Sequence, residues 1–324
     1  MLIQRAYKTE LDPTPAQRET FKRYADAARF IFNWGLGKRI ELYEAEKKSI
    51  SLYDQSKEIV RLKASGELAW LLEISNRVPR WALRSVDYAF KNFFRRIKKG
   101  GNGKPGFPRF KSWRDHIQKF KLDSCIRVTL SAIRLPRIGW VKLKEKSYLP
   151  GHVKINSATV SSQAGRWFVS IQVELEHTIP PPNPDHDISI HLDFSPEFNP
   201  YYLTSDGQKL DPCKPLERAL RRLRKLSRRH QRKVMDSKNR DKARQRLAKL
   251  HWRIAEKRKD FLHKATTRLA KNYSIITVEK PDLERMLQHA PTPIARATAD
   301  AAFGEFVRQL TYKTKWYGSE LKII

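Results

Sequence analysis

Cysteine is nearly absent from this chain: its 324 residues include only Cys125 and Cys213, and no C-x-x-C spacing occurs. Two distant cysteines do not make a disulfide framework, and they cannot supply the four thiolates of a zinc ribbon. No stretch approaches the roughly 18 apolar residues of a membrane span. The N-terminal sequence MLIQRAYKTEL has no apolar segment typical of a signal peptide. These absences predict a protein of the cytoplasm or nucleoid without a membrane partner.

Acidic residues are also scarce relative to basic ones. The chain has 66 Lys and Arg against 34 Asp and Glu, which gives a formal net charge of +32. An excess of this size indicates a long polyanion as partner. Nucleic acid is favoured over an anionic membrane surface, because the basic segments alternate with Trp, Tyr and Phe and are not confined to one run. A hydrophobic content of 40% predicts folded domains rather than disorder.

The first half of the chain changes pattern twice. Residues 1–11 predict a short strand, and residues 15–98 have the three-and-four spacing of amphipathic helices, with Thr14 or Asp12 as the candidate helix cap. Glycine and proline crowd residues 98–112, which indicates a domain boundary. Residues 117–176 alternate polar and apolar side chains over short runs. This alternation predicts a small antiparallel barrel or sandwich.

The second half begins after a proline-rich linker at residues 177–187. A strand and a hairpin turn at Asp206-Gly207 are expected next. Two long basic helices follow over residues 215–270, with the sequence MDSKNRD as the turn between them. The apolar run 273–278 predicts a central strand buried on both faces, and a final helix is expected over residues 296–317.

The helical pair carries the highest positive charge density. Residues 214–264 contain 21 Lys or Arg and 5 Asp or Glu. A solvated charged face is the ordinary explanation of such a run, but self-repulsion at this density favours a bound polyanion. We therefore predict nucleic-acid contacts at Arg221, Arg222, Arg224, Lys225, Arg228, Arg229, Arg232, Arg253, Lys257 and Arg258.

The N-terminal helices offer side chains able to read bases. Tyr53, Asn76, Arg77, Arg80 and Arg84 lie on segments rich in polar and aromatic groups. Arg can bind guanine edges through two hydrogen bonds, and Asn can do so with adenine. Phosphate contact or plain surface charge remains the alternative for each of them.

Two carboxylates are expected at the ends of strands. Glu279 ends the run YSIITVE before Pro281, and Asp193 lies in SIHLDFS, two residues after His191. A two-metal nuclease needs three or four converging acidic groups. The later candidates are not in strand-end contexts: Asp282, Glu284, Asp300, Glu305 and Glu320. The residues therefore predict an incomplete site, and an ion pair for Glu279 is an open alternative.

Several segments together resemble TnpB, the transposon-encoded OrfB family. They are YKTELDPTPAQ, ARFIFNWGL, YAFKNFF, GKPGFPRFKS, HWRIAEKRKDFLHKATTRLAKNYSIITVEKPDL and DAAFGEFVRQLTYKTKWYGSEL. The resemblance implies a multidomain α+β protein. It comprises a wedge-type antiparallel β-barrel (1–11 and 104–180), an inserted helical recognition domain (12–103), a linker (181–187) and a truncated RuvC/RNase H-like α/β domain without the zinc ribbon (188–324).

The family's nuclease site is an Asp-Glu-Asp triad, and its Glu falls on Glu279. Its first Asp falls in SIHLDFS, where the family has GIDLG, so the position is taken by Asp193 or by His191. The apolar-Asp-apolar-small order favours Asp193. The last Asp and the zinc ribbon would follow the final residue. The resemblance therefore implies a degenerate remnant, Asp193 and Glu279, with no functional catalytic residue, no required cofactor and no zinc; a residual Mg²⁺ stays open.

Within the family, the nuclease-dead repressors called TldR fit best. The resemblance then implies an RNA-guided protein that binds motif-flanked double-stranded DNA, forms an R-loop and represses transcription by blocking a promoter. We expect a monomeric ribonucleoprotein in the bacterial cytoplasm, with guide RNA and heteroduplex on the basic helices. Motif contacts are expected at Tyr53, Lys57, Asn76, Arg77, Arg80 and Lys121. The alternatives are an active TnpB-type RNA-guided endonuclease and a structural guide-RNA-binding protein.

Overall fold

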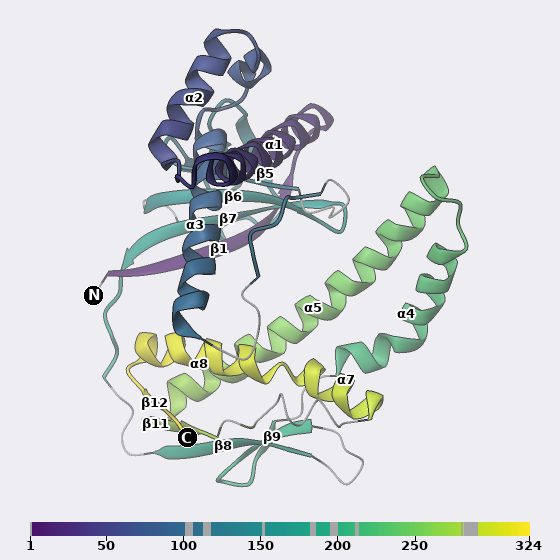
Figure 1. Ribbon diagram of the computed structural model, residues 1–324. Coiled ribbons are helices and arrows are strands. Elements are labelled where there is room, and N and C mark those ends of the chain that lie inside the picture. The colour runs from purple at the N-terminus through teal and green to yellow at the C-terminus, as the bar shows by residue number, and fades with distance from the viewer. Residues whose placement is uncertain are drawn as a thin grey trace. The chain divides into compact units, whose positions relative to one another are not determined.

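The chain forms two compact units, Leu2–Leu175 and Glu176–Ile324. This is seen in a computed structural model (Figure 1), which describes residues 2–100, 106–112, 118–150, 153–181, 186–194, 200–210, 214–279, 281 and 291–324. The two units meet at residues 175 and 176, just before the proline-rich segment. Part of the expected linker, residues 182–185, lies outside the described residues.

The N-terminal unit combines helices with a sheet. Its elements are β1 (Leu2–Asp12), α1 (Pro15–Glu46), α2 (Leu52–Ala64), a 3-10 helix (Ala69–Glu73), α3 (Arg77–Lys99), β2 (Lys119–Leu122), β3 (Arg127–Val128), β4 (Ala132–Leu135), β5 (Gly139–Leu143), β6 (Lys154–Gln163) and β7 (Arg166–Glu176). The expected N-terminal strand and the helices after it are confirmed. Thr14, one of the two candidates, caps α1, because its hydroxyl accepts a hydrogen bond from the Gln17 N–H at 3.3 Å.

The strands of this unit form one seven-stranded sheet in the order β2-β6-β7-β1-β5-β4-β3. The pairs β2–β6, β6–β7, β1–β5, β5–β4 and β4–β3 are antiparallel. The antiparallel pairing agrees with the sequence pattern. Within the described residues no pairing joins the end strands β2 and β3, so closure of this sheet into a barrel stays a prediction.

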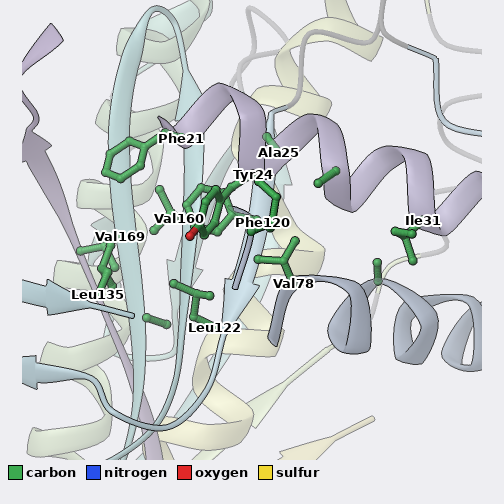
Figure 2. Packing of buried hydrophobic residues seen from close by; sticks show 14 of the residues in the cluster. Phe21, Tyr24, Ala25, Ile31, Val78, Phe120, Leu122, Leu135, Val160 and Val169 are labelled. Carbon is green, nitrogen blue, oxygen red and sulfur yellow. The ribbon is translucent and has the colours of Figure 1, made fainter. Parts of the chain in front are cut away.

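The helices and the sheet share one core (Figure 2). Phe21 of α1 packs against Phe120 of β2 and Trp167 of β7, with ring centroids 5.8 and 5.1 Å apart. Helix α3 lies close to α1 at Gly35, where an added Cβ would come within 2.7 Å of the Leu83 side chain. Helix α1 therefore packs against both the sheet and α3.

The C-terminal unit contains β8 (Asp187–Phe194), β9 (Pro200–Thr204), β10 (Lys209–Leu210), α4 (Pro215–Gln231), α5 (Lys238–Asn272), β11 (Ile275–Val278), α7 (Thr292–Ala301), α8 (Phe303–Tyr317) and β12 (Glu320–Ile323). The basic helices, a strand within residues 273–278 and the turn at Asp206-Gly207 are confirmed. The expectation that this strand is buried on both faces is wrong, because Ile276 and Val278 are buried whereas Ile275 and Thr277 are only partly buried. The single helix expected over residues 296–317 is wrong, because Ala302 takes a left-handed φ of 54° and separates α7 from α8.

The sheet of this unit has the order β10-β9-β8-β11-β12. Strand β9 pairs antiparallel with β8 and β10, whereas β11 pairs parallel with β8 and β12. A three-stranded meander extended by two parallel strands is the RNase H-like arrangement implied by the sequence. Its core is formed by strand residues such as Ile190 and Val278, together with Leu262 of α5 and Phe306 of α8. Among the described helices, none is long and apolar enough to cross a membrane.

Candidate nucleic-acid interface

Helices α4 and α5 form an antiparallel hairpin of basic residues in the C-terminal unit (Figure 1). Its turn is ordered, because the Ser237 hydroxyl accepts a hydrogen bond from the Arg240 N–H at 3.1 Å and so caps α5. Nine of the ten predicted contact residues on these helices are exposed to solvent, and Arg258 is half-buried. The hairpin therefore presents a long cationic surface, which is the electrostatic footprint of a phosphate backbone partner.

A buried carboxylate anchors this hairpin. Asp300 of α7 is 5% exposed, and it accepts hydrogen bonds from the Leu216 N–H at 3.1 Å and from Arg258 Nε at 3.0 Å. Helix α4 has no side-chain cap from its own N-cap residue, Lys214. Asp300 thus satisfies the start of α4 and places a negative charge where the helix dipole favours one.

Arg258 differs from the other predicted contacts. Its guanidinium forms an ion pair with Asp300, and its side chain is 28% exposed. The structure therefore gives Arg258 an internal partner that fixes α5 against α7. Asp300 was a candidate for the missing metal-binding carboxylate. Its two oxygens instead accept hydrogen bonds from Arg258 and from the Leu216 N–H.

In the N-terminal unit, Arg77 and Arg80 of α3 gather around one carboxylate. Their guanidinium nitrogens lie 3.5 and 3.6 Å from the two oxygens of Asp123, which follows β2. The two arginine side chains are 38% and 49% exposed, whereas that of Asp123 is 12% exposed. Asp123 therefore lies within ion-pair distance of two partly exposed arginines, although its Oδ1 atom accepts no hydrogen bond from the described residues. The sequence did not indicate Asp123, because it lies more than forty residues from them in the chain.

Lys121 joins the same cluster through an aromatic ring. Its ammonium lies 3.8 Å from the ring centroid of Trp81, and the Arg84 guanidinium lies 5.1 Å from that centroid. Burial lowers the pKa of Lys121, and Asp123 partly opposes this shift. Three of the six predicted motif contacts, Arg77, Arg80 and Lys121, are therefore brought together at α3 and β2.

The other three predicted motif contacts form separate pairs. Lys63 donates a hydrogen bond to the Asn76 Oδ1 atom at 2.7 Å, at the start of α3. The Lys57 ammonium lies 4.4 Å from the ring centroid of Tyr53 on α2, and Tyr53 is 67% exposed. Tyr53 and Lys57 thus offer a ring and a cation to solvent.

The strand register decides which residue lies beside Glu279. Val278 pairs with Ile190 in the parallel ladder, and the Glu279 N–H donates to the Ile190 carbonyl at 3.1 Å. Continuing this register by one residue places Glu279 beside His191. Because side chains alternate along a strand, both then lie on the face opposite the core. Asp193 lies two residues farther along the same face of β8.

Asp193 has its own partner on the neighbouring strand. The Tyr201 hydroxyl donates to the Asp193 Oδ2 atom at 2.8 Å, and this hydrogen bond raises the pKa of Tyr201. Glu279 is exposed. The geometry therefore provides an imidazole level with Glu279 and a carboxylate one step away, which differs from a pair of adjacent carboxylates.

The remaining acidic candidates are engaged or distant. Glu305 forms a two-bond ion pair with Arg308, which lowers the pKa of Glu305 to about 2. Glu320 pairs with Ile275 in the ladder, at the end of β11 away from Glu279. Asp282 and Glu284 lie outside the described residues. Among the described residues, no group of three or more His, Cys, Asp and Glu could hold a metal ion.

These residues are a poor match for the metal pair that the nuclease family uses. Mg²⁺ prefers hard oxygen ligands in octahedral geometry, and an imidazole is a poor substitute for a bridging carboxylate. Since no group of three or more His, Cys, Asp and Glu gathers among the described residues, the described donor set does not fit two Mg²⁺ ions.

The C-terminal unit thus combines an RNase H-like sheet with an anchored cationic hairpin. The protein-family model of IS605 OrfB, described as "Probable transposase", matches residues 170–290 of this chain. The family model of the OrfB helix-turn-helix domain matches residues 1–48. In this chain residues 2–46 form β1 and the single helix α1, so the matched segment is a strand and one long helix.

Two bacterial relatives match nearly the whole chain. InsQ of Escherichia coli K12, described as a candidate RNA-guided DNA endonuclease, is 30% identical over 331 residues, covering 98% of this chain and 79% of InsQ. A Streptomyces pristinaespiralis protein with the same type of description is 32% identical over 332 residues, covering 99% and 77% of the two chains. The chain therefore belongs to the TnpB/OrfB family of IS605.

A solved structure shares the fold. The cryo-EM structure of a Cas12f1–sgRNA–target DNA complex matches with a TM-score of 0.54 and 10% sequence identity, covering 99% of this chain and 89% of that one. At this identity the likeness concerns the fold alone. It agrees with the multidomain α+β class expected from the sequence.

Proposed function

We propose that this protein is an RNA-guided DNA-binding protein. The observation that carries the proposal is the α4–α5 hairpin, whose nine exposed predicted contact residues are all cationic. In a protein of the TnpB/OrfB family, such a surface suits the backbone of a guide RNA and of its heteroduplex with the target strand. Base pairing supplies the sequence specificity, and the protein contacts the phosphates.

The N-terminal unit supplies the contact with duplex DNA. Arg77 and Arg80 lie within ion-pair distance of Asp123, and Lys121 lies beside them on Trp81. Guanidinium groups placed in this way suit guanine edges or phosphates at a short motif next to the target. The protein acts as a monomeric ribonucleoprotein with guide RNA and motif-flanked double-stranded DNA as partners.

We further propose that the nuclease site is inactive. The support is the register that sets His191, and not Asp193, level with Glu279. In the alignment of SIHLD with the family's GIDLG, this register gives His191 the place of the first Asp. Cleavage through two metal ions then lacks a ligand on β8. A bound complex that does not cut blocks RNA polymerase at a promoter, which makes a transcription repressor the preferred role.

An active RNA-guided endonuclease is the second candidate function. The descriptions of the relatives favour it, and Glu279 keeps the strand-end position that the family's nuclease uses. Asp193 would then serve as the β8 ligand after release from Tyr201. A protein that only holds a guide RNA, without a DNA target, is the third alternative.

The first experiment expresses the chain with its native genomic flanks and sequences the RNA that copurifies. A discrete RNA with a constant scaffold and a variable end supports guided binding, and heterogeneous background RNA overturns it. A gel shift on matched duplex, with and without that RNA, separates guided DNA binding from simple RNA storage.

Cleavage is then assayed on matched plasmid with Mg²⁺. We expect guide-dependent binding without cutting, and reporter repression when the target overlaps a promoter. Guide-dependent cutting that Glu279→Ala abolishes would establish the endonuclease instead. His191→Asp is the informative companion variant, because gain of cutting with this change alone identifies position 191 as the lost ligand.

A further inference from the structure

A groove with an apolar floor runs between α4 and α5 of the C-terminal unit, with a volume of about 710 Å³. Its floor consists of Leu210, Leu250, Ile254, Phe261 and Leu269. Pockets that hold small organic ligands measure about 300–1,000 Å³, so a base with its ribose fits the space. An apolar floor is unexpected on a surface that only tracks phosphates.

Cations line the rim of the groove on both sides. Arg218 and Arg222 come from α4, and Arg253 and Lys257 come from α5. In the described part of the chain, no carboxylate lies within ion-pair distance of Arg218, Arg222 or Arg253. The carboxylate that lines the groove, Asp260, is paired with Lys264 at 2.7 Å. The lining thus keeps a net positive charge that is complementary to an anionic chain, and the floor suits a planar apolar group.

The β9–β10 turn contributes Gln208 to the lining of the groove. Asp206 accepts hydrogen bonds from the Gln208 N–H at 3.2 Å and from the Tyr273 hydroxyl at 3.3 Å. Arg268 donates to the Gln208 side-chain oxygen at 3.0 Å. Gln208 and Tyr273 both line the groove, so its lining includes polar groups that can meet the edge of a base.

We propose that this groove receives one unpaired nucleotide of a nucleic-acid strand. The base lies on the apolar floor, and the phosphates on either side contact the cations of the rim. Base stacking on protein side chains and backbone neutralisation together are the usual means of binding single strands. The proposal rests on the proposed function, and it adds a base site to a surface otherwise expected to contact phosphates.

Filling the groove without changing its charge tests the proposal. Ala219 lines the groove on α4 and is half-buried, so Ala219→Phe occupies the space of the base and leaves every cation in place. Ala219→Leu is a milder filling variant. Gln245→Phe is the control, because Gln245 is exposed on α5 and does not line the groove.

The probes are three short labelled oligomers of equal length: an oligouridylate, an oligothymidylate and an abasic ribose-phosphate chain. We expect the full chain, freed of copurified RNA, to bind at least one base-bearing oligomer about tenfold more tightly than the abasic chain. Ala219→Phe should remove that preference and keep the abasic affinity. Preference for oligouridylate points to the guide RNA, and preference for oligothymidylate points to a displaced DNA strand.

Two results would overturn the groove assignment: no preference for bases in the unchanged protein, or a preference that survives in both Ala219 variants with normal melting temperatures. The proposed function fails separately. If no discrete RNA copurifies but the preference and its loss are observed, guided targeting is wrong while the groove still binds unpaired nucleotides. If a discrete RNA copurifies and the Ala219 variants bind the oligomers as the unchanged protein does, only the groove assignment is wrong.

Discussion

The guanidinium of Arg258 is bound to the buried carboxylate of Asp300, and the same carboxylate caps the first turn of α4 through Leu216. A single side chain of α7 thus sets the base of the cationic hairpin. The arrangement separates two kinds of cation on α5, those that hold the fold and those available to a ligand. It follows that substitutions of neighbouring residues should affect different properties.

Asp300→Ala should destabilise the C-terminal unit strongly. The change leaves Arg258 and the Leu216 N–H without their acceptor, and breaking a buried pair on one side costs about 3 kcal/mol or more. Denaturant unfolding measures the loss. Glu256→Ala is the control, since Glu256 forms an exposed pair with Lys259 at 3.2 Å and should matter by less than about 1 kcal/mol. Equal effects of the two changes would contradict a structural role for Asp300.

Neutralising exposed cations of α4 should change the salt dependence of RNA binding. Arg224 and Arg228 are exposed and lie four residues apart, so they share one face of the helix. If each contacts a phosphate, Arg224→Gln and Arg228→Gln should each reduce the slope of log K against log salt by about 1. Lys154→Gln is the control in the other unit, because Lys154 is paired with Glu174. If both variants keep the slope of the unchanged protein, this face of α4 does not contact the RNA.

Lys111 should make the stability of the N-terminal unit depend on pH. Its ammonium lies 3.5 Å from the ring centroid of Phe32, and burial lowers the pKa of Lys111 from 10.5 to about 8. A lysine with a depressed pKa in the folded state binds fewer protons there than in the unfolded chain. Its contribution to stability therefore increases as pH rises from about 8 to about 10.5.

Lys111→Met tests this contribution. Methionine keeps an apolar contact with Phe32 and removes the titrating group, so the variant should melt at a higher temperature than the unchanged protein at neutral pH. The difference between the two proteins should shrink toward pH 10.5. Thermal melts across this range measure it. A difference independent of pH would show that Lys111 is not forced toward its neutral form by folding.

Local sequence patterns were sufficient for several elements of both units. The capped start of α1 at Thr14, the turn at Asp206-Gly207 and the strand before Glu279 each follow from a few adjacent residues. The break at Ala302 was not predicted, because alanine favours helix and nothing nearby marks the left-handed residue. Ala302 and Phe303 pack with the core of the C-terminal unit, so contacts distant in sequence bear on the conformation there.

The candidate site depends on contacts and strand pairings between residues distant in sequence, which local patterns do not predict. Arg258 lies between Lys257 and Lys259 in the sequence, and only the helical phase and the position of α7 direct it to Asp300. Similarly, whether His191 or Asp193 lies level with Glu279 is a question of strand register. Register is set by the pairing of buried faces, and two residues on the same face of one strand look alike in sequence.

Asp123 should control the recognition of the motif beside the target. Its carboxylate lies 3.5 and 3.6 Å from the guanidinium nitrogens of Arg77 and Arg80, and Asp123→Asn removes the charge that pairs with them while keeping the shape. Freed guanidinium groups bind duplex phosphates of any sequence. We therefore expect the variant, loaded with its guide, to bind duplex DNA more tightly overall and to discriminate about tenfold less between motifs.

Binding to a library of targets with randomised flanks measures both effects at once. Asp26→Asn is a matched control, because Asp26 forms an exposed pair with Arg29 at 3.0 Å on α1 of the same unit. The control should keep the motif preference, since it alters the net charge equally without touching α3. If Asp123→Asn also keeps the full preference, Arg77 and Arg80 do not read the motif, and the aromatic and cationic pair of Tyr53 and Lys57 on α2 becomes the surface to vary next.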